Sequence, residues 1–335
     1  MKPIALRSLR SSRSALIAAL IAGLCLPAAA FADERTLDGV NFMGPLITPN
    51  PAGMPKGGLF IEPYLVRINS DSYFDGEGRR HDSEGRSSAW LTVVPIAYGL
   101  GQRVTAQVNL SASRAETGSD RSRGFRAGDT TAMVQYLLQA PSADGTRPAV
   151  SVSLSQRYAT GSYDRIDGNP LNAQGDGVQR TTFGLGVQQV VWLPNGRPLR
   201  WRSQLSASPA PARVALNDHS VYGTPEGFRG NIAPGSLIGL SAAGEYSFNP
   251  KWVGVMEVAV SRQSDRHLSG YAPAADGSMQ RFDERRPGSR NVTLAPAVQY
   301  HFSPSVGLIA GVEFTVAGRN TGSYINPQVA LGMFF

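Results

Sequence analysis

Two short patterns combine residue types that could act on a chemical bond. His301 and Ser303 are two residues apart, so on a β-strand they share one face, where an imidazole could activate a serine hydroxyl. Pro304 follows and places the pair beside a turn, so we expect His301 to be an interior polar residue. Asp218-His219-Ser220 places neighbouring residues on alternating faces and defines no triad. The sequence therefore predicts no catalytic residue.

Metal and cofactor signals are equally sparse. The four histidines are scattered, without the close spacing of metal ligands. One loop gathers oxygen ligands that could suit calcium, at Asp167, Asn169, Asn172 and Asp176, but Pro170 interrupts any EF-hand-like pattern. Gly184-Leu185-Gly186 lacks the third glycine of a phosphate-binding loop. We predict no metal site and no cofactor.

A set of charged residues lies on the polar face of segments whose other face is apolar. We predict that these residues line the lumen of a barrel: Arg103, Arg157, Arg200, Arg202, Glu245, Glu257 and Glu313. Opposed rows of charge could orient polar solutes in a pore. They could equally pair across a filled interior and make it rigid, and the sequence leaves both open. Arg103 lies beside the Gly99-Leu100-Gly101 turn, at the expected rim.

The elements that carry these charges alternate between apolar and polar residues. In the clearest case, Val104, Ala106, Val108, Leu110 and Ala112 alternate with Thr105, Gln107, Asn109, Ser111 and Ser113. We expect strands at 59–68, 88–98, 104–113, 129–138, 150–157, 180–193, 199–205, 236–246, 252–262, 291–301, 306–316 and 326–335. This even number predicts an all-β, transmembrane, antiparallel up-and-down β-barrel of about 12 strands, with both termini on the periplasmic side.

Connections of two kinds alternate between these strands. Short turns such as Pro194-Asn195-Gly196 have aromatic neighbours, which fits a girdle of aromatic side chains at the periplasmic interface. Long polar stretches fill 69–86, 114–128, 162–179, 208–235, 263–289 and 317–325, and we expect them to be external loops. Their arginine clusters, such as Arg285-Arg286, would meet lipopolysaccharide phosphates or solvent.

The two ends of the chain carry the features of an exported membrane protein. Residues 1–32 combine a basic start, an apolar run and Ala30-Phe31-Ala32, the pattern of a cleaved signal peptide. Their removal lowers the formal charge from +7 to +3, because they hold four of the 32 basic residues and none of the 25 acidic ones. A nucleic-acid partner is therefore not expected. Residues 33–57, rich in proline, form either a periplasmic linker or a lumen plug, and residues 58–335 the barrel.

At the other end, Val329, Leu331, Met333 and Phe335 share one face of the last segment. This pattern resembles the closing strand that the outer-membrane barrel assembly machinery recognises, with Phe335 as its terminal aromatic residue. The expected location is the bacterial outer membrane, with its lipid and lipopolysaccharide as partners.

Several motifs in order along the chain resemble one family. They are Gly44-Pro45-Leu46-Ile47-Thr48-Pro49-Asn50-Pro51, Ile61-Glu62-Pro63-Tyr64, Gly128-Asp129-Thr130-Thr131, Ala159-Thr160-Gly161-Ser162-Tyr163-Asp164 and Leu294-Ala295-Pro296-Ala297-Val298-Gln299-Tyr300. The chain is similar here to the MetA-pathway phenol-degradation family. The resemblance implies an outer-membrane barrel that is associated with the catabolism of aromatic compounds and commonly labelled a transporter, and it assigns no catalytic or ligand residue.

These features predict an outer-membrane channel for passive diffusion of small molecules. The aromatic or hydrophobic character of those solutes comes from the resemblance alone. Two alternatives remain, an outer-membrane barrel enzyme that acts on lipid and a structural or adhesion barrel.

Overall fold

The computed structural model describes residue 37 and residues 39–335. The predicted signal peptide lies outside these residues. The described chain is all-β apart from one 3-10 helix, η1 (Pro170–Asn172). None of the helices in this part is long and apolar enough to cross a membrane.

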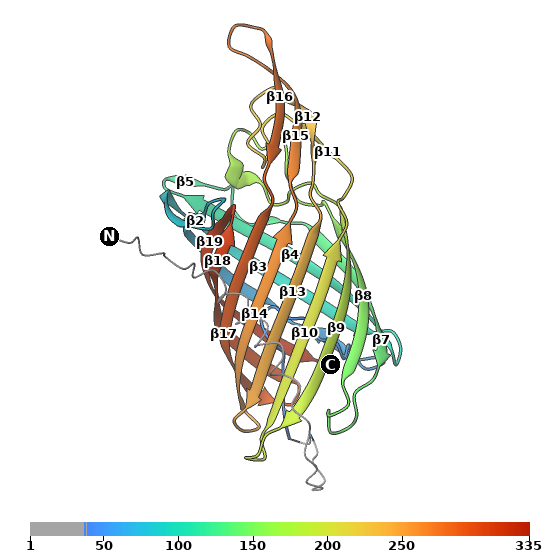
Figure 1. Cartoon of the computed structure of the whole chain (residues 1–335). Coiled ribbons are helices and arrows are strands. Elements are labelled where there is room, and N and C mark those ends of the chain that lie inside the picture. Colours follow the sequence, from blue (N-terminus) through green and yellow to red (C-terminus); the bar gives the residue numbers. More distant parts are fainter. Residues whose placement is uncertain (1–36, 38) are drawn as a thin grey trace, which may run out of the picture. The chain divides into compact units, whose positions relative to one another are not determined.

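Twelve long antiparallel strands close into a barrel (Figure 1), which confirms the predicted fold class. Around the ring the order is β2-β19-β18-β17-β14-β13-β10-β9-β8-β7-β4-β3, and β3 pairs with β2 again. The strands of the ring are β2 (Tyr64–Phe74), β3 (Arg80–Gly99), β4 (Val104–Thr117), β7 (Thr130–Gln139), β8 (Ala149–Tyr158), β9 (Arg180–Trp192), β10 (Pro198–Ser208), β13 (Leu237–Ser247), β14 (Trp252–Gln263), β17 (Ser289–Ser303), β18 (Val306–Arg319) and β19 (Thr321–Phe334). Closure leaves no long strand of the ring without a neighbour on either side.

A short strand, β1 (Leu59–Ile61), precedes β2 and pairs with the same two neighbours. Phe60 lies opposite Ala97 of β3 and Phe334 of β19. Glu62 and Pro63 interrupt the line between β1 and β2, because a proline has no N–H to give to the ladder.

The period-two pattern places apolar residues outside and polar residues inside. On β4, Val108 and Leu110 are exposed on the outer face, at 38% and 45% of their surface. Asn109, between them, points inward and lines an interior cavity. Large apolar side chains are exposed in the same way on other strands, among them Leu65, Val134, Leu154, Leu185, Leu205, Leu240 and Met256.

Two of the expected loops are largely strand. β2 runs to Phe74 and β3 begins at Arg80, so only a short turn remains of the loop expected at 69–86. β18 and β19 are joined at Asn320, whose φ is 46°, so the loop expected at 317–325 was also wrong. Beyond the apolar band most residues of these strands are polar, with exceptions such as Tyr73 and Phe74, so the alternation that marks a strand in the sequence is weak.

The loops expected at 208–235 and 263–289 instead build a second, four-stranded sheet. Its order is β11 (Val214–Asn217), β12 (Arg229–Ala233), β15 (Arg266–Pro273) and β16 (Met279–Arg286). Leu216, Phe228, Ile232 and Leu268 form a buried apolar core on this sheet. This sheet rises from the end of the barrel where β14 and β17 are joined to it (Figure 1). Two further short strands, β5 (Asp120–Arg121) and β6 (Arg126–Ala127), pair with the end of β4.

Aromatic side chains gather at the opposite end of the barrel. Trp252 and Tyr300 pack edge to face at 4.7 Å between ring centres, and Tyr300 packs on Phe302 in the same way at 5.1 Å. Tyr246 and Phe248 form a third such pair. These rings lie beside the short turns, as the sequence predicts for an interfacial girdle.

Candidate functional site

Residues 41–57, here called the N-terminal segment, run through the interior of the barrel. The Met54 N–H donates to Thr105 Oγ1 of β4 at 2.8 Å. Thr48 binds Glu257 of β14, which lies on the opposite side of the ring, with five strands between β4 and β14 in either direction. Between these points, Gln135 of β7 donates to the carbonyl oxygens of Asn50 and Pro51 at 3.0 and 2.9 Å. The segment therefore spans the interior from wall to wall.

Glu257 is the main anchor of the segment. Leu46, Ile47 and Thr48 lie between two prolines, which have no N–H, and the N–H groups of all three donate to the Glu257 carboxylate. The distances are 3.1 Å from Ile47 to each oxygen and 2.9 Å from Thr48, and the Thr48 hydroxyl donates as well at 3.1 Å. Three consecutive backbone donors form a concave site that suits an anion.

A second carboxylate, Glu245 of β13, is satisfied by the barrel wall. Arg200 of β10 donates two hydrogen bonds of 2.8 Å to its two oxygens, and Arg202 lies 3.2 Å away. Gln299 of β17 donates to Glu245 at 3.0 Å and to the Gly44 carbonyl oxygen at 2.8 Å. Glu245 has no exposed surface, so its charge depends entirely on these partners.

Glycines in the wall give the segment room. A Cβ on Gly332 of β19 would lie 2.6 Å from the Met43 sulfur, and one on Gly307 of β18 would lie 3.1 Å from it. Phe42, next to Met43, packs under Arg200 with the guanidinium carbon 4.4 Å from the ring centre. The wall is thus shaped to receive the side chains of the segment.

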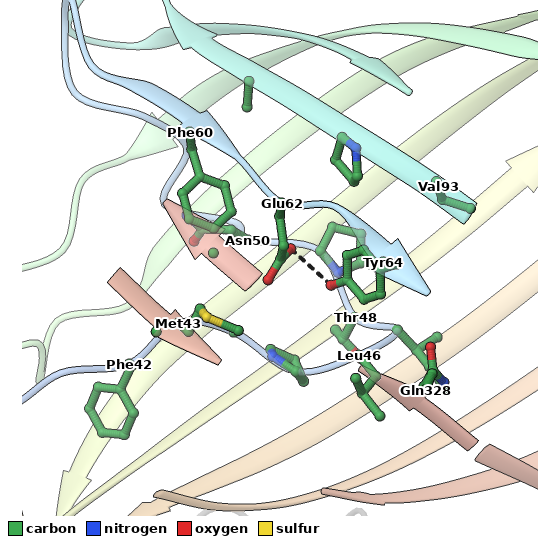
Figure 2. A pocket seen from close by; sticks show the side chains of 18 of the residues that line it. Phe42, Met43, Leu46, Thr48, Asn50, Phe60, Glu62, Tyr64, Val93 and Gln328 are labelled. Atoms are coloured by element: carbon green, nitrogen blue, oxygen red, sulfur yellow. Dashed lines mark hydrogen bonds between the residues drawn. The ribbon is translucent and has the colours of Figure 1, made fainter. Parts of the chain in front are cut away.

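A cavity of about 610 Å³ remains between the N-terminal segment and the wall formed by β2, β3 and β19. Apolar side chains of β2 and β3 line it, among them Val66, Ile68, Leu91 and Val93. Polar lining residues of the wall are Glu62, Tyr64, Gln107, Asn109, Arg200, Arg202, His301, Ser305, Glu313, Asn326 and Gln328, and the segment adds Thr48 and Asn50. In Figure 2, Glu62 and Tyr64 project toward the segment, which carries Met43, Leu46 and Thr48 across the view. The cavity has the volume of an ordinary small-molecule site.

The residues predicted to line the lumen fall into three groups. Arg200, Arg202, Glu245 and Glu257 come together in the cluster that holds the N-terminal segment. Glu313 lines the cavity and accepts a hydrogen bond from Tyr324 Oη at 3.1 Å.

The remaining two lie away from this cavity. Arg157 forms ion pairs with Asp176 at 2.6 Å and Asp129 at 3.8 Å, beside the connection that follows β8. Arg103 is exposed beside the short turn before β4, and its Nη1 lies 3.5 Å from the Leu138 carbonyl oxygen.

Sequence reasoning missed Glu62 and Tyr64 as interior residues. The break at Glu62-Pro63 hides the alternation that would have placed them on the inner face. It also missed Gln135 and Gln299, whose amides hold backbone groups of the segment. The sequence feature that could have identified Gln135 and Gln299 is that each lies on the polar face of a strand with alternating residues.

The patterns that suggested chemistry have other partners. His301 is buried, and its Nε2 lies 3.3 Å from Gln299 Oε1. The Ser303 hydroxyl accepts from the N–H groups of Ser305 and Val306 and thereby shapes the turn. Within the described residues, no group of three or more His, Cys, Asp or Glu side chains is arranged to hold a metal ion.

Charged residues on the four-stranded sheet are mostly paired with one another. His267 Nε2 lies 2.6 Å from Asp283, and Arg281 lies 2.9 Å from the same carboxylate. The His267 hydrogen bond and the Arg281 charge lower the pKa of Asp283. Arg285 pairs with Asp265, and a hydrogen bond from the Gly288 N–H helps to lower the pKa of Asp265. These arginines therefore already have anionic partners within the chain.

Comparison with known proteins supports the fold. No family model and no curated protein matches the sequence. An outer membrane channel from Pseudomonas putida F1 is similar in structure, with a TM-score of 0.61 and 16% identity over 85% of this chain and 98% of that one. The toluene transporter TodX from Pseudomonas putida matches with a TM-score of 0.41 and 12% identity, over 85% of this chain and 92% of that one. The first comparison shows that the chain shares its barrel fold with an outer membrane channel.

Proposed function

We propose that this protein is a channel of the bacterial outer membrane through which small molecules diffuse passively. The observation that carries the proposal is a closed barrel with an apolar outer face around an interior cavity of about 610 Å³. Such an outer face needs lipid around it, and such an interior gives a solute space that lipid does not fill.

The N-terminal segment is, in this proposal, a plug that narrows the channel. Its backbone is held by Glu257, Gln299 and Gln135, which belong to separate parts of the wall. Solutes pass on the side of β2 and β3, where the cavity lies. A wider path requires the segment to break its hydrogen bonds with Glu257, Gln299 and Gln135. The alternative of a periplasmic linker does not account for these hydrogen bonds.

The solutes are small and largely apolar. The cavity wall at Val66, Ile68, Leu91 and Val93 is unusual for a barrel interior, because inward positions of water-filled barrels are mostly polar. Aromatic compounds fit this wall, in line with the resemblance to the MetA-pathway family. The charged residues Arg200, Arg202, Glu245 and Glu257 serve the plug and the wall rather than a row of solute sites.

The proposed location in the outer membrane determines the partners of the protein. The outer face contacts outer-membrane lipid and the exposed end contacts lipopolysaccharide. Barrel assembly depends on β19 and the terminal Phe335, whose N–H and carbonyl pair with Leu59.

Conductance recording in planar bilayers tests the proposal. The purified mature protein should give discrete current steps, and heat-denatured protein from the same preparation should give none. A folded barrel that gives no steps and no flux of small solutes in proteoliposomes would contradict a channel.

The same recording separates a channel from an enzyme that acts on lipid. Ser303→Ala should leave conductance unchanged, because a pore needs no nucleophile. A lipid-hydrolysing activity of the parent protein that disappears in Ser303→Ala would favour the enzyme instead.

A further inference from the structure

Two buried acceptor atoms of cavity-lining residues have no partner within the described part of the chain. Glu62 Oε1 and Asn326 Oδ1 have no hydrogen-bond partner among the described residues, and both residues line the cavity. Each residue is 8% exposed. A buried acceptor without a donor costs free energy, so such an atom in a cavity wall indicates a place where a ligand donates.

The position of Glu62 is fixed on its other side. Its N–H donates to the Pro95 carbonyl oxygen of β3 at 3.1 Å, and Tyr64 Oη donates to Glu62 Oε2 at 2.8 Å. Figure 2 shows this bond, with the second carboxyl oxygen of Glu62 turned away from Tyr64. The tyrosine thus occupies one oxygen and leaves the other as the free acceptor.

The wall between the two acceptors is apolar. Val66 pairs with Leu91 of β3 and Gln328 of β19, and Ile68 follows on the same face of β2. Asn326 is two residues before Gln328 on β19, so it lies at the far end of this strip from Glu62. A molecule along the strip would contact apolar side chains over its length and meet an acceptor at an end.

Unpaired donors are fewer at this site. Arg202 Nε is also buried without a partner among the described residues, but the Arg202 side chain is 2% exposed and pairs with Glu245. Glu62 and Glu313 line the same cavity, and the two arginines that also line it, Arg200 and Arg202, are already paired with Glu245. Outside these ion pairs, the buried polar atoms of the cavity-lining residues that lack a partner within the described part of the chain are acceptors.

We propose that this cavity binds small apolar molecules that carry one hydrogen-bond donor, a hydroxyl or an amine, and that Glu62 selects them by accepting that hydrogen. The proposal deepens the proposed function and rests on it, because the cavity is the solute site of the channel. Solutes of the same size without a donor bind more weakly, since Glu62 Oε1 then stays unpaired.

Cysteine protection tests the selection directly. The sequence has one cysteine, Cys25, within the predicted signal peptide, so Val93→Cys gives the mature chain a single thiol in the cavity wall. A small water-soluble thiol reagent modifies this cysteine in the purified, folded protein, and bound solutes slow the reaction. Benzyl alcohol and its isomer anisole form the matched pair, because only the alcohol can donate. Benzoate tests for an anion site, and all three are compared at equal free aqueous concentration.

The decisive variant is Glu62→Gln in the Val93→Cys background. The amide oxygen takes the hydrogen bond from Tyr64 and the amide NH₂ group replaces the free acceptor. The ratio of benzyl alcohol to anisole protection should fall about tenfold, the loss expected for one hydrogen bond to a carboxylate. Val66→Ala removes only apolar surface from the cavity wall. It should weaken the protection by both solutes and leave the ratio unchanged.

Three results would overturn the proposal: an unchanged ratio in Glu62→Gln, stronger protection by benzoate than by benzyl alcohol, or a Val93→Cys thiol that the reagent never reaches.

If Glu62→Gln does not give the heat-modifiable migration of a folded barrel, Tyr64→Phe gives the second test. It frees another acceptor oxygen and should keep or raise the ratio, and a fall in the ratio there would contradict the role of Glu62. Conductance of the same proteins reports separately on the channel, so a conducting barrel without solute selection refutes this inference alone.

Discussion

Single carboxylates in the interior of this barrel have two different kinds of partner. Glu245 is satisfied by Arg200, Arg202 and Gln299, which all belong to the wall. Glu257 is satisfied by the backbone of a segment about two hundred residues away in the chain. Removing one partner of a buried charge is costly in both cases. Loss of a partner at Glu245 would destabilise the barrel itself. Loss of a partner at Glu257 would weaken the docking of the N-terminal segment.

Glu257→Gln should therefore release the segment without unfolding the barrel. The substituted NH₂ group faces the N–H donors of Leu46, Ile47 and Thr48, and docking should weaken by about 3 kcal/mol, the order of one or two hydrogen bonds to a charged group. We expect higher single-channel conductance and faster proteolysis within residues 41–57. Glu313→Gln is the matched control, because Glu313 lines the same cavity but binds Tyr324. Equal conductance in the two variants would mean that Glu257 does not hold the plug.

At the scale of elements, the strands were predictable, and for the N-terminal segment the sequence left a linker and a plug open and gave no path. Period-two alternation depends on neighbours two residues apart, and it located all twelve strands of the ring. The path of the segment depends on Glu257, Gln299 and Gln135, which no local pattern links to it. The four-stranded sheet was missed for a related reason, since its strands are short and its core is shared among three of the expected loops. Of the charged site, the sequence predicted the residues but not their pairing, because register between strands is set by tertiary contacts.

The two faces of β4 give a direct test of strand orientation. Val108→Arg places a charge on the apolar outer face and should cost about 2 to 4 kcal/mol near the bilayer midplane. Asn109→Arg points into the cavity, so it should fold and shift ion selectivity toward anions. Urea unfolding in lipid vesicles measures the first effect and reversal potentials measure the second. Equal destabilisation by both substitutions would contradict the assigned faces.

The closing strand carries a prediction about assembly. Phe335 donates its N–H to the Leu59 carbonyl oxygen at 2.8 Å, and Leu59 donates back at 3.0 Å, so these two bonds complete the junction of β19 with β1. Deleting Phe335 removes them together with the terminal aromatic ring, and insertion into the outer membrane should fall. The fraction of heat-modifiable protein in membranes measures it. Phe302→Ala removes an exposed aromatic side chain from the same end of the barrel and should assemble normally. Normal assembly of the deletion would show that Phe335 is not an assembly signal in this chain.

At the scale of the whole molecule, one wall of the interior is charged and amide-rich and the other carries an apolar strip of Val66, Ile68, Leu91 and Val93. The N-terminal segment lies between them and contacts both, through Glu257 and Gln299 on one side and along the cavity beside β2 and β3 on the other. The barrel supplies every strand pair without it. We therefore expect the stability of the barrel and the width of the proposed solute path to depend on different parts of the chain.

Removal of residues 41–54 should separate these two properties. The deletion keeps the bond from the Gly57 N–H to the Gly99 carbonyl oxygen, 2.8 Å long, so the start of β1 stays in place. Heat-modifiable migration should remain that of a folded barrel, while single-channel conductance should rise several-fold, because the interior loses the chain that spans it. A Gly-Ser sequence of equal length at 41–54 serves as the matched control. It preserves the chain length but lacks Thr48 and the prolines. If hydrogen bonds to the wall keep the segment in the lumen, this variant should also raise the conductance. Conductance equal to that of the parent in both variants would place the solute path elsewhere and refute the plug.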